Sequence, residues 1–308
     1  MLTIRVLGAA AGGGFPQWNA NSEACQRARA GDPAAPVATQ ASIAVSVDGA
    51  RWFVVNASPD LRGQIEANPC LHPQAGTRSS PIAGVILTNA DIDAIAGLLH
   101  LREGTPFAVY GSAEALAILE QNPIFEVVNR DLVPRRKLAI DEWQMLILAD
   151  GTASGLEVRP FRVPGKLPLY LEGELADMAV PDDSGGTLAL EVRGGGSRFI
   201  YAANCAGMND EVADRLKGSP LLFFDGTLFT DDEMIRQGVG RKTGRRMGHM
   251  SLSGPQGSLA ELGRLGLGRG VFIHINNTNP ILFRDSAQRR QVEAAGFEVA
   301  YDGMEIAL

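Results

Sequence analysis

Histidine, cysteine and long apolar runs are scarce in this sequence of 308 residues. It has only four histidines, His72, His100, His249 and His274, so a metal centre built mainly from imidazoles is nearly excluded. Its three cysteines are too few and too widely spaced for a disulfide framework. No apolar run approaches the roughly 18 residues of a membrane span, and the N-terminal segment lacks the pattern of a signal peptide. We therefore expect a cytoplasmic protein with no membrane span.

An excess of basic charge is also absent. The chain has 28 Lys and Arg against 35 Asp and Glu, a formal charge of −7. Nucleic-acid binding requires a basic surface, so we expect no nucleic-acid partner. With 45% hydrophobic and 20% charged residues, the composition is typical of a globular protein. Because no shift in composition marks a boundary, the sequence predicts a single domain over residues 1–308.

Short apolar runs bounded by Gly, Asp, Asn and Pro recur along the chain and predict strands. The predicted strands are Thr3–Gly8, Ala41–Val47, Arg51–Asn56, Ala83–Leu87, Phe107–Tyr110, Met145–Leu148, Leu156–Val163, Thr187–Val192, Arg198–Ala202, Leu221–Asp225, Val271–His274 and Phe297–Ala307. The predicted helices are Asp60–Ala67, Asp91–Leu101, Ala113–Gln121, Asp210–Lys217, Asp231–Gln237, Ser258–Leu265 and Ser286–Ala295. The last strand segment contains Asp302-Gly303, a hairpin turn signal. This order favours an α/β fold, an αββα four-layer sandwich, over a doubly wound parallel sheet.

Two glycine-containing segments allow both a functional and a plain structural interpretation. Gly8–Gly14 follows a strand, but its spacing matches no phosphate-binding motif, so a sharp turn with close backbone packing is favoured. Pro164–Gly186, with three prolines and four glycines, predicts a long surface loop. Such loops often act as lids, although a solvated excursion fits equally well.

Polar residues gather where a predicted strand meets a predicted helix, at Asn89, Asp91 and Asp93. At a spacing of two, their oxygens can point into one cavity and suit a hard or borderline cation. Carboxylates at a helix start also cap the helix and complement its dipole. Both interpretations stay open from these residues alone.

Three later segments also carry candidate chemistry. Asp225 ends an apolar strand, and a basic cluster over residues 241–246 precedes His249 on a glycine-containing loop. The cluster could hold an anionic group, and His249 could move a proton or bind a metal; a solvated charged loop is the alternative. His274 ends another apolar strand and is followed by Asn276 and Asn277, a pattern that marks sites more often than cores.

Taken together, these segments resemble the family of pyrroloquinoline quinone (PQQ) biosynthesis protein B, within the metallo-β-lactamase superfamily. Residues 87–94, LTNADIDA, align with the superfamily motif LTHxHxDH. The family resemblance lies in GAAAGGGFPQWN (8–19), NASPDLR (56–62), GLLHLREG (97–104), DGTLFTDDEMIRQGVGRKTGRRMGH (225–249), HINNTNPIL (274–282) and YDGMEI (301–306). Phosphodiesterases of phosphonate degradation are similar more distantly. The resemblance implies the same sandwich fold.

The resemblance also identifies what this chain lacks. Superfamily hydrolases bind two metals through five histidines and two aspartates. The corresponding positions here, apart from Asp93 and His274, hold Asn89, Asp91, Ala94, Pro164 and Asn204. An amide, an alanine and a proline cannot replace imidazoles and a bridging carboxylate, so a di-zinc hydrolase is excluded.

The remaining side chains suit one metal with mixed oxygen and nitrogen ligands. His274 and Asp93, with Asp91 or His249, could form a facial set with open positions, which is typical of non-haem Fe(II) chemistry. The resemblance then implies that Fe(II) and O₂ hydroxylate the tyrosine ring of a Glu–Tyr-derived precursor of PQQ. His249 and Asp225 would be catalytic, moving protons or orienting the phenol. Substrate-binding residues would be Asn89, Asn276, Asn277, Arg245 and Arg246.

The resemblance leaves a second function open, a non-catalytic carrier that binds PQQ or its precursor for delivery or transport to the periplasm. A degenerate ligand set is what an enzyme turned binder would show. Partners would be the small precursor or PQQ and other PQQ biosynthesis proteins, and a homodimer is compatible. The family commonly has a Cys-x-Cys-x-x-Cys zinc cluster, of which only Cys25 remains beside Ala20 and Ser22, so we expect no structural zinc.

Overall fold

The computed structural model describes residues 1–171 and 186–308, and within them two seven-stranded sheets lie face to face. The first sheet has the order β14-β1-β2-β3-β4-β5-β6 and the second β13-β12-β11-β10-β9-β8-β7. The first comprises β1 (Thr3–Gly8), β2 (Ser42–Ser46), β3 (Trp52–Val55), β4 (Ile82–Ile86), β5 (Ala108–Gly111), β6 (Arg135–Lys137) and β14 (Glu305–Ala307). The second comprises β7 (Gln144–Ile147), β8 (Ala153–Arg162), β9 (Leu188–Gly194), β10 (Ser197–Ala202), β11 (Leu222–Asp225), β12 (Gly270–Ile273) and β13 (Phe297–Val299).

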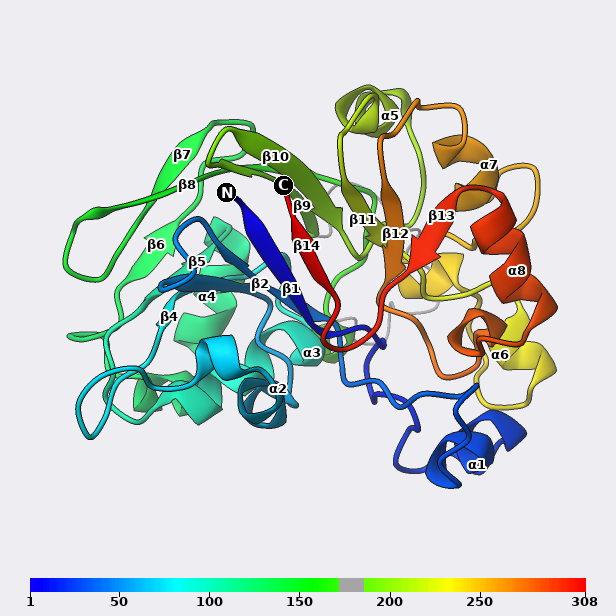
Figure 1. Ribbon diagram of the computed structural model, residues 1–308, viewed down its shortest axis with the longest axis horizontal. Coiled ribbons are helices and arrows are strands. Elements are labelled where there is room, and N and C mark those ends of the chain that lie inside the picture. The colour runs from blue at the N-terminus through cyan, green and yellow to red at the C-terminus, as the bar shows by residue number, and fades with distance from the viewer. Residues whose placement is uncertain (172–185) are drawn as a thin grey trace.

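Helices cover the outer face of each sheet (Figure 1). On the first sheet lie α2 (Leu61–Ala67), α3 (Ile92–Ile95) and α4 (Ala113–Gln121); on the second lie α5 (Asp210–Leu216), α7 (Ser258–Leu262) and α8 (Ala287–Ala294). Two short helices, α1 (Glu23–Arg29) and α6 (Glu233–Arg236), complete the second side. The predicted αββα sandwich is therefore confirmed.

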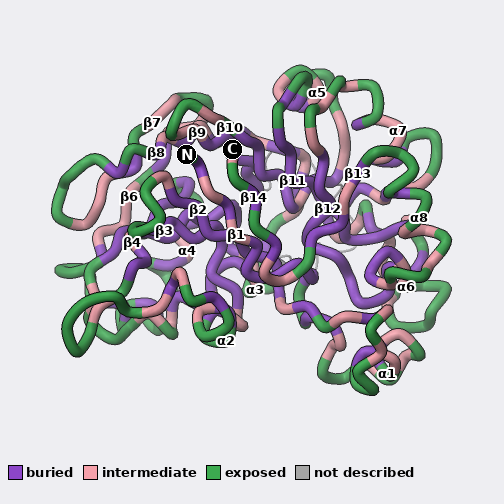
Figure 2. The backbone as a smooth tube through the Cα atoms, viewed as in Figure 1, coloured by how far each residue is buried: buried purple, intermediate pink, exposed green. Residues whose placement is uncertain are grey.

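The core between the sheets is built from alternate strand residues. Ile43 and Phe53 point into it from the first sheet, and Phe199 and Phe223 from the second. Strands that are apolar on both sides, such as β2 and β11, also bury their other face under helices, and Figure 2 shows them buried along their length. Burial of both faces explains why these strands read as continuous apolar runs in the sequence.

Outside the strands, the structure contains some of the predicted helices as predicted and others in altered form. Ser112 and Asn209 cap α4 and α5 by accepting hydrogen bonds from backbone N–H groups, as typical N-cap residues do. The predicted helix Asp91–Leu101 is a short α3 followed by a 3₁₀ segment. Helix α1 and strand β6 were not predicted. The predicted lid, Pro164–Gly186, falls largely on residues 172–185, which lie outside the described residues, and it stays a prediction.

The hairpin predicted over Phe297–Ala307 is wrong. Strand β13 pairs in parallel with β12 in the second sheet, whereas β14 pairs antiparallel with β1 in the first, and Figure 1 shows the two red strands diverging. The Asp302-Gly303 turn carries the chain from one sheet to the other. Asp302 links this turn to the N-terminal loops. Its carboxylate accepts hydrogen bonds from Ala9 N (3.0 Å) and from the backbone N–H and the hydroxyl of Thr39 (2.7 Å each).

Because Asp302 is buried, we expect the free energy of unfolding of the protein to depend on pH. Burial raises its pKa to about 6 although Thr39 and Ala9 donate hydrogen bonds to it, whereas an unfolded aspartate titrates at about 4. Between these values the folded state holds more protons than the unfolded state, so stability falls as pH rises, by roughly 3 kcal/mol in total. Urea denaturation of wild type and Asp302→Asn from about pH 4 to 7 should show this fall in the wild type only. Parallel profiles for the two proteins would contradict it.

Among the described residues, no helix combines the length and the apolarity needed to cross a membrane.

Candidate functional site

A cavity of about 530 Å³ lies where the strands of the second sheet end. Strands β10, β11 and β12 run in parallel, so the residues that follow them meet at one edge. Asn204 follows β10, Asp225 ends β11, and His274 follows β12; Asp93, on α3, approaches from the first sheet. The cavity is lined by Ala11, Gly12, Gly13, Gln17, Gln40, Asp91, Ile92, Asp93, Lys166, Asn204, Thr227, Met234, Lys242, Met247, His249, His274 and Asn276.

The backbone at His274 is unusual. Its φ of +62° lies in the left-handed region, which non-glycine residues rarely adopt and which concentrates at functional sites. Neighbouring hydrogen bonds hold the turn, from Gly226 N to Ile273 O (2.7 Å) and from Asn276 N to Thr227 O (3.0 Å). The turn holds the His274 ring against the ring of His249, with centroids 5.1 Å apart.

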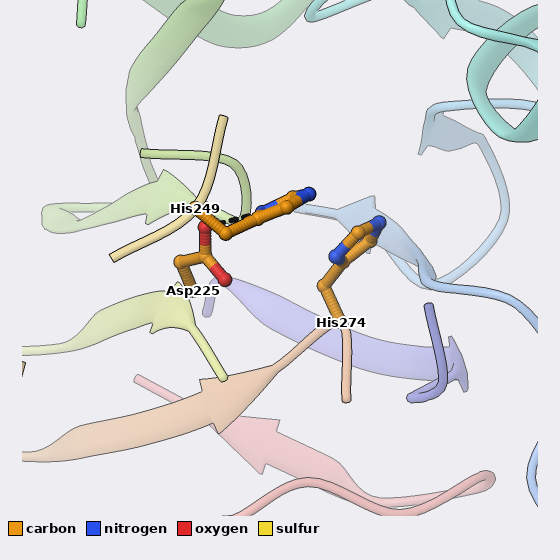
Figure 3. Close-up of side chains that lie close together, drawn as sticks. All are labelled: Asp225, His249 and His274. Carbon is orange, nitrogen blue, oxygen red and sulfur yellow. Dashed lines mark hydrogen bonds and ion pairs between the residues drawn. The ribbon is translucent and has the colours of Figure 1, made fainter. Parts of the chain in front are cut away.

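Asp225 is fully buried, and both of its carboxylate oxygens accept hydrogen bonds, of which Figure 3 shows the one from His249. Oδ1 accepts from the backbone N–H (3.0 Å) and hydroxyl (2.7 Å) of Thr227, and Oδ2 accepts from Cys205 N (2.9 Å) and from Nδ1 of His249 (2.7 Å). Asp225 therefore fixes the orientation of His249, as a carboxylate beside a ligating histidine does.

Thr227 extends this arrangement to His274. Its single hydroxyl proton goes to Asp225, so its oxygen accepts from Nδ1 of His274, 2.8 Å away. Both imidazoles therefore carry a proton on Nδ1 and keep Nε2 for other partners. Figure 3 shows these outer nitrogens pointing to the same side, away from Asp225.

On the cavity side, Nε2 of His274 lies 3.1 Å from Oδ2 of Asp93. Burial alone would raise the pKa of Asp93, but the hydrogen bond and the charges of the two histidines outweigh it, so this pKa is lowered. Burial alone would lower the pKa of His274, but the Asp93 carboxylate outweighs that effect, so this pKa is raised. Both shifts favour the charged forms of Asp93 and His274.

Within the described residues, Asp225, His249 and His274 form a cluster that could hold a metal ion, with ligand atoms within 4.8 Å of one another. Asp225 already accepts four hydrogen bonds, so Asp93 is the better carboxylate ligand. Two bonds of about 2.1 Å meeting at about 90° place their ligand atoms about 3.0 Å apart. The Asp93–His274 separation of 3.1 Å therefore fits two neighbouring ligands of one ion.

The structure brings together only some of the predicted acidic and amide residues. Asp91 lines the cavity, and its Oδ1 lies 3.4 Å from Nζ of Lys166; its side chain makes no capping hydrogen bond to α3. Asn89 is buried beside the cavity rather than lining it. Its Oδ1 accepts from Asp91 N (3.0 Å), and its amide lies 3.4 Å from Asn204 Oδ1, so it supports the loop instead of facing a substrate.

The two asparagines after His274 also differ in position. Asn276 lines the cavity and donates to Thr278 Oγ1 (2.6 Å). Asn277 is buried next to it and donates to Gln17 Oε1 at 2.5 Å, so it holds a cavity-lining side chain without lining the cavity itself. The predicted substrate contact thus fits Asn276 alone.

The basic segment divides between two cavities. Lys242 lines the cavity that His274 lines. Arg245 lines a second cavity of about 570 Å³, which shares His249 with the first, and Arg246 lines neither of the two. Neither arginine lines the cavity that His274 lines, and their predicted part in substrate binding stays a prediction. Arg245 belongs to a 3₁₀ turn held by its own N–H donating to Asp231 Oδ1 (2.8 Å), which directs it outward.

Sequence reasoning missed several residues of the site. Lys166 lies on the loop predicted over Pro164–Gly186, for which the sequence indicated a lid or a solvated excursion but no site residue. Thr227 could have been found from its spacing of two after Asp225. The predicted sharp turn at Gly8–Gly14 agrees with φ values of +93° at Gly13 and +71° at Gly14. The same segment also lines the cavity: a Cβ on Gly12 would lie 3.6 Å from Asp93 Oδ2.

Cys25, the remaining thiol of the family's zinc cluster, lies buried on α1 against the helix-covered core. The expectation that it binds no structural zinc stays a prediction.

Comparison with known proteins agrees with this fold. Residues 51–275 match the family model described as a beta-lactamase superfamily domain. The chain is 55% identical over 306 residues to a protein of Gluconacetobacter diazotrophicus named coenzyme PQQ synthesis protein B, covering 99% of each. It is 50% identical over 311 residues to the protein of that name from Rhodopseudomonas palustris, covering 100% of each.

Solved structures give the same result. The crystal structure of Zn²⁺-bound PqqB from Methylobacterium extorquens superposes with a TM-score of 0.94 at 47% identity, covering 99% of this chain and 100% of that one. A diphosphatase of the PhnP family superposes with a TM-score of 0.68 at 18% identity, covering 99% and 96%, and shows a shared fold only.

Proposed function

This chain belongs to the beta-lactamase superfamily and to the coenzyme PQQ synthesis protein B family, and we propose that its part in PQQ biosynthesis is an oxygenase reaction. The reaction is the Fe(II)- and O₂-dependent hydroxylation of the tyrosine ring of a Glu–Tyr-derived precursor. One oxygen atom replaces a ring hydrogen, and the other leaves as water with two electrons from an external reductant. The observation that carries this proposal is the placement of Asp93, His249 and His274 on one cavity. Two imidazoles and one carboxylate are the ligand set of non-haem Fe(II) oxygenases.

Of these three side chains, Asp93 and His274 lie at a separation that suits two ligands of one ion, and His249 lines the same cavity. His249, His274 and Asp93 would hold Fe(II), with Asp91 beside them, and the bound iron supplies the activation of O₂. Nε2 of His274, which lies 3.1 Å from Oδ2 of Asp93, would carry no proton as a ligand, as metal-bound imidazole nitrogens do not. A two-metal hydrolase is disfavoured, because Asn89, Asn204 and other former ligand positions offer no second imidazole or carboxylate set.

The rest of the cavity suits an acidic aromatic substrate. Lys166 and Lys242 line it and can attract carboxylates, and Met234, Met247 and Ile92 offer apolar surface for a ring. Asp225 is too deeply buried to touch the substrate. It acts by holding Nδ1 of His249, which keeps Nε2 of that ring directed at the cavity.

The two basic residues that face different cavities give a matched test of substrate binding. Lys242→Met should raise the KM for the acidic precursor roughly 10-fold, since it removes a partly desolvated charge from the cavity. Arg245→Met removes a positive charge three residues away and should leave KM within about twofold, because Arg245 lines the other cavity. Steady-state O₂ uptake by both variants measures this. Equal effects, or a larger effect for Arg245→Met, would contradict the assignment.

The proposed activity is tested with purified, metal-free protein. Anaerobic titration should show one Fe(II) bound per chain. Adding a Glu–Tyr dipeptide together with a two-electron reductant such as ascorbate under air should start O₂ consumption above that seen without dipeptide. Iron-free protein and Zn(II)-loaded protein are the controls, because neither can activate O₂.

The carrier of PQQ or its precursor remains the second candidate, and a specific observation favours it: the ligand set has lost most of the superfamily's metal-binding side chains. Both functions use the same cavity and the same lysines. Tight binding of PQQ by a protein that binds no iron would favour the carrier, with delivery toward the periplasm as its role.

A further inference from the structure

A buried carboxylate outside the proposed metal site is not used by the proposed reaction. Glu233, on α6, is 4% exposed, and its Oε2 accepts hydrogen bonds from the backbone N–H groups of Phe229 (2.7 Å) and Thr230 (3.1 Å). Its Oε1 accepts from the hydroxyl of Thr278 at 2.7 Å. Burial raises the pKa of this carboxyl, although the three hydrogen bonds favour its charged form. Because a carboxylate only accepts, the Thr278 hydroxyl points its proton at Glu233.

The fixed hydroxyl of Thr278 in turn fixes the side-chain amide of Asn276. With its one proton directed at Glu233, Thr278 Oγ1 accepts, and its donor is Nδ2 of Asn276 at 2.6 Å. The amide oxygen of Asn276 accepts from Nδ2 of Asn277 at 3.3 Å. The second hydrogen on Nδ2 of Asn276 has no acceptor among the described residues. Since Asn276 lines the cavity, its side chain offers the cavity a hydrogen-bond donor.

A second amide is arranged in the same way. Gln17 lines the cavity, and its Oε1 accepts from Nδ2 of Asn277 at 2.5 Å. Its Nε2 donates one hydrogen to Oδ1 of Asn19 (2.8 Å), and the other hydrogen has no acceptor in the part of the chain that the structure describes. Nδ2 of Asn277 lies between the two amide oxygens, so the remaining N–H groups belong to neighbouring side chains. N–H donors of this kind suit the oxygens of a carboxylate.

Helix α6 holds the Asn276 loop at two points. In addition to Glu233, Gln237 at the end of the helix donates from Nε2 to the backbone oxygen of Thr278 at 2.9 Å. Thr278 itself is 5% exposed, so these contacts are shielded from water. The direction of the Asn276 amide is thus set by a helix about 40 residues earlier in the chain.

We propose that Glu233 and Thr278 are positioning residues that turn an N–H of Asn276 toward the cavity, where it binds a carboxylate oxygen of the acidic substrate. The inference deepens the proposed function, because it names the group that Asn276 recognises, and it rests on the substrate site of that proposal. In the carrier alternative the same donor would hold a carboxylate of PQQ. Binding measured without iron tests the inference apart from the reaction.

The test is Glu233→Gln, which keeps the volume of the side chain. The glutamine oxygen can still accept from the two backbone N–H groups, but its NH₂ group replaces Oε1 and donates to Thr278. The hydroxyl proton of Thr278 then points to Asn276, whose amide turns its oxygen to that side. Titration of iron-free protein with a Glu–Tyr dipeptide should show binding at least about 10-fold weaker than in wild type, since a hydrogen bond to a charged group is lost. Removal of a negative charge would by itself strengthen the binding of an acidic ligand, so the sign of the change is informative.

Two controls accompany this variant. Glu261→Gln removes the same charge from a residue that lines the second cavity, and it should leave the dipeptide affinity within about twofold of wild type. Gln–Tyr and the C-terminal amide of Glu–Tyr each lack one carboxylate. One of these analogues should bind equally to wild type and Glu233→Gln, because a carboxamide can offer either its oxygen or its NH₂ group to Asn276.

Unchanged or tighter dipeptide binding by Glu233→Gln would overturn the proposal. An equal loss for the dipeptide and both analogues would also overturn it, because a merely structural role would give that result. If Glu233→Gln does not fold, Thr278→Ser and Thr278→Val decide: serine keeps the hydroxyl and should keep the affinity, valine should lose it, and equal affinities would contradict the proposal.

PQQ, which also carries carboxylates, is titrated as a second ligand to separate this inference from the proposed function. Failure of wild type to bind either PQQ or the dipeptide would overturn the inference. If these binding effects are found but no hydroxylation occurs, the result counts against the proposed function alone.

Discussion

Replacing His274 by asparagine should abolish Fe(II) binding while leaving the fold in place. His274 supplies the ligand nitrogen nearest to Asp93, so its loss should weaken binding by more than about 100-fold, beyond the effect of an outer residue. Asparagine is chosen because the φ of +62° at this position strains alanine, whereas asparagine tolerates the left-handed region. Anaerobic titration of the metal-free variant, together with its denaturation midpoint, measures both effects.

His100→Asn is the control for this prediction. His100 is exposed on the 3₁₀ segment after α3 and does not line the cavity, so its loss should change neither Fe(II) affinity nor stability by much. Stoichiometric, tight Fe(II) binding by His274→Asn would remove His274 from the metal site and leave the Asp93–His274 pair as a structural ion pair.

Asp225→Asn should have the largest combined effect on stability and activity. The buried carboxylate accepts four hydrogen bonds, and an amide NH₂ in its place would meet donors instead of offering an acceptor. We expect a loss of about 2 to 4 kcal/mol in the free energy of unfolding. The His249 ring would also lose its fixed tautomer, so turnover should fall by at least about 100-fold.

Asp232→Asn is the matched control for this loss. Asp232 is exposed and its Oδ1 pairs with Arg236 at 3.1 Å, and such a surface pair contributes at most about 1 kcal/mol. Urea denaturation and O₂ uptake should therefore show little change in this variant. Equal effects of the two substitutions on stability or turnover would contradict the role of Asp225 as the group that orients His249.

Much of the fold could be predicted because each strand is itself an apolar run bounded by turn residues. What could not be predicted was which strands pair. The residues of Phe297–Ala307 do not indicate that β13 joins the edge of the second sheet and β14 the edge of the first. A Gly-containing turn signals a reversal of the chain, but which strands it joins depends on partners about 300 residues away, such as Thr3 beside Ala307.

The candidate site was predictable where polar residues end apolar strands, as Asp225 and His274 do, because strand order brings such ends to one edge. The site was not predictable where the path of an irregular loop decides which way a side chain points. Lys242 and Arg245 lie three residues apart in one basic run, yet a 3₁₀ turn places them on different cavities.

The most direct test of the central claim follows the oxygen atom. Fe(II)-loaded protein is mixed with a Glu–Tyr dipeptide and a two-electron reductant under ¹⁸O₂, and the product is examined by mass spectrometry, with Asp93→Ala and His274→Asn as controls. The oxygenase account predicts a ring-hydroxylated product that carries one heavy oxygen atom in wild type and is missing from both variants. Unchanged dipeptide in wild type, or hydroxylation that persists in both variants, would contradict it.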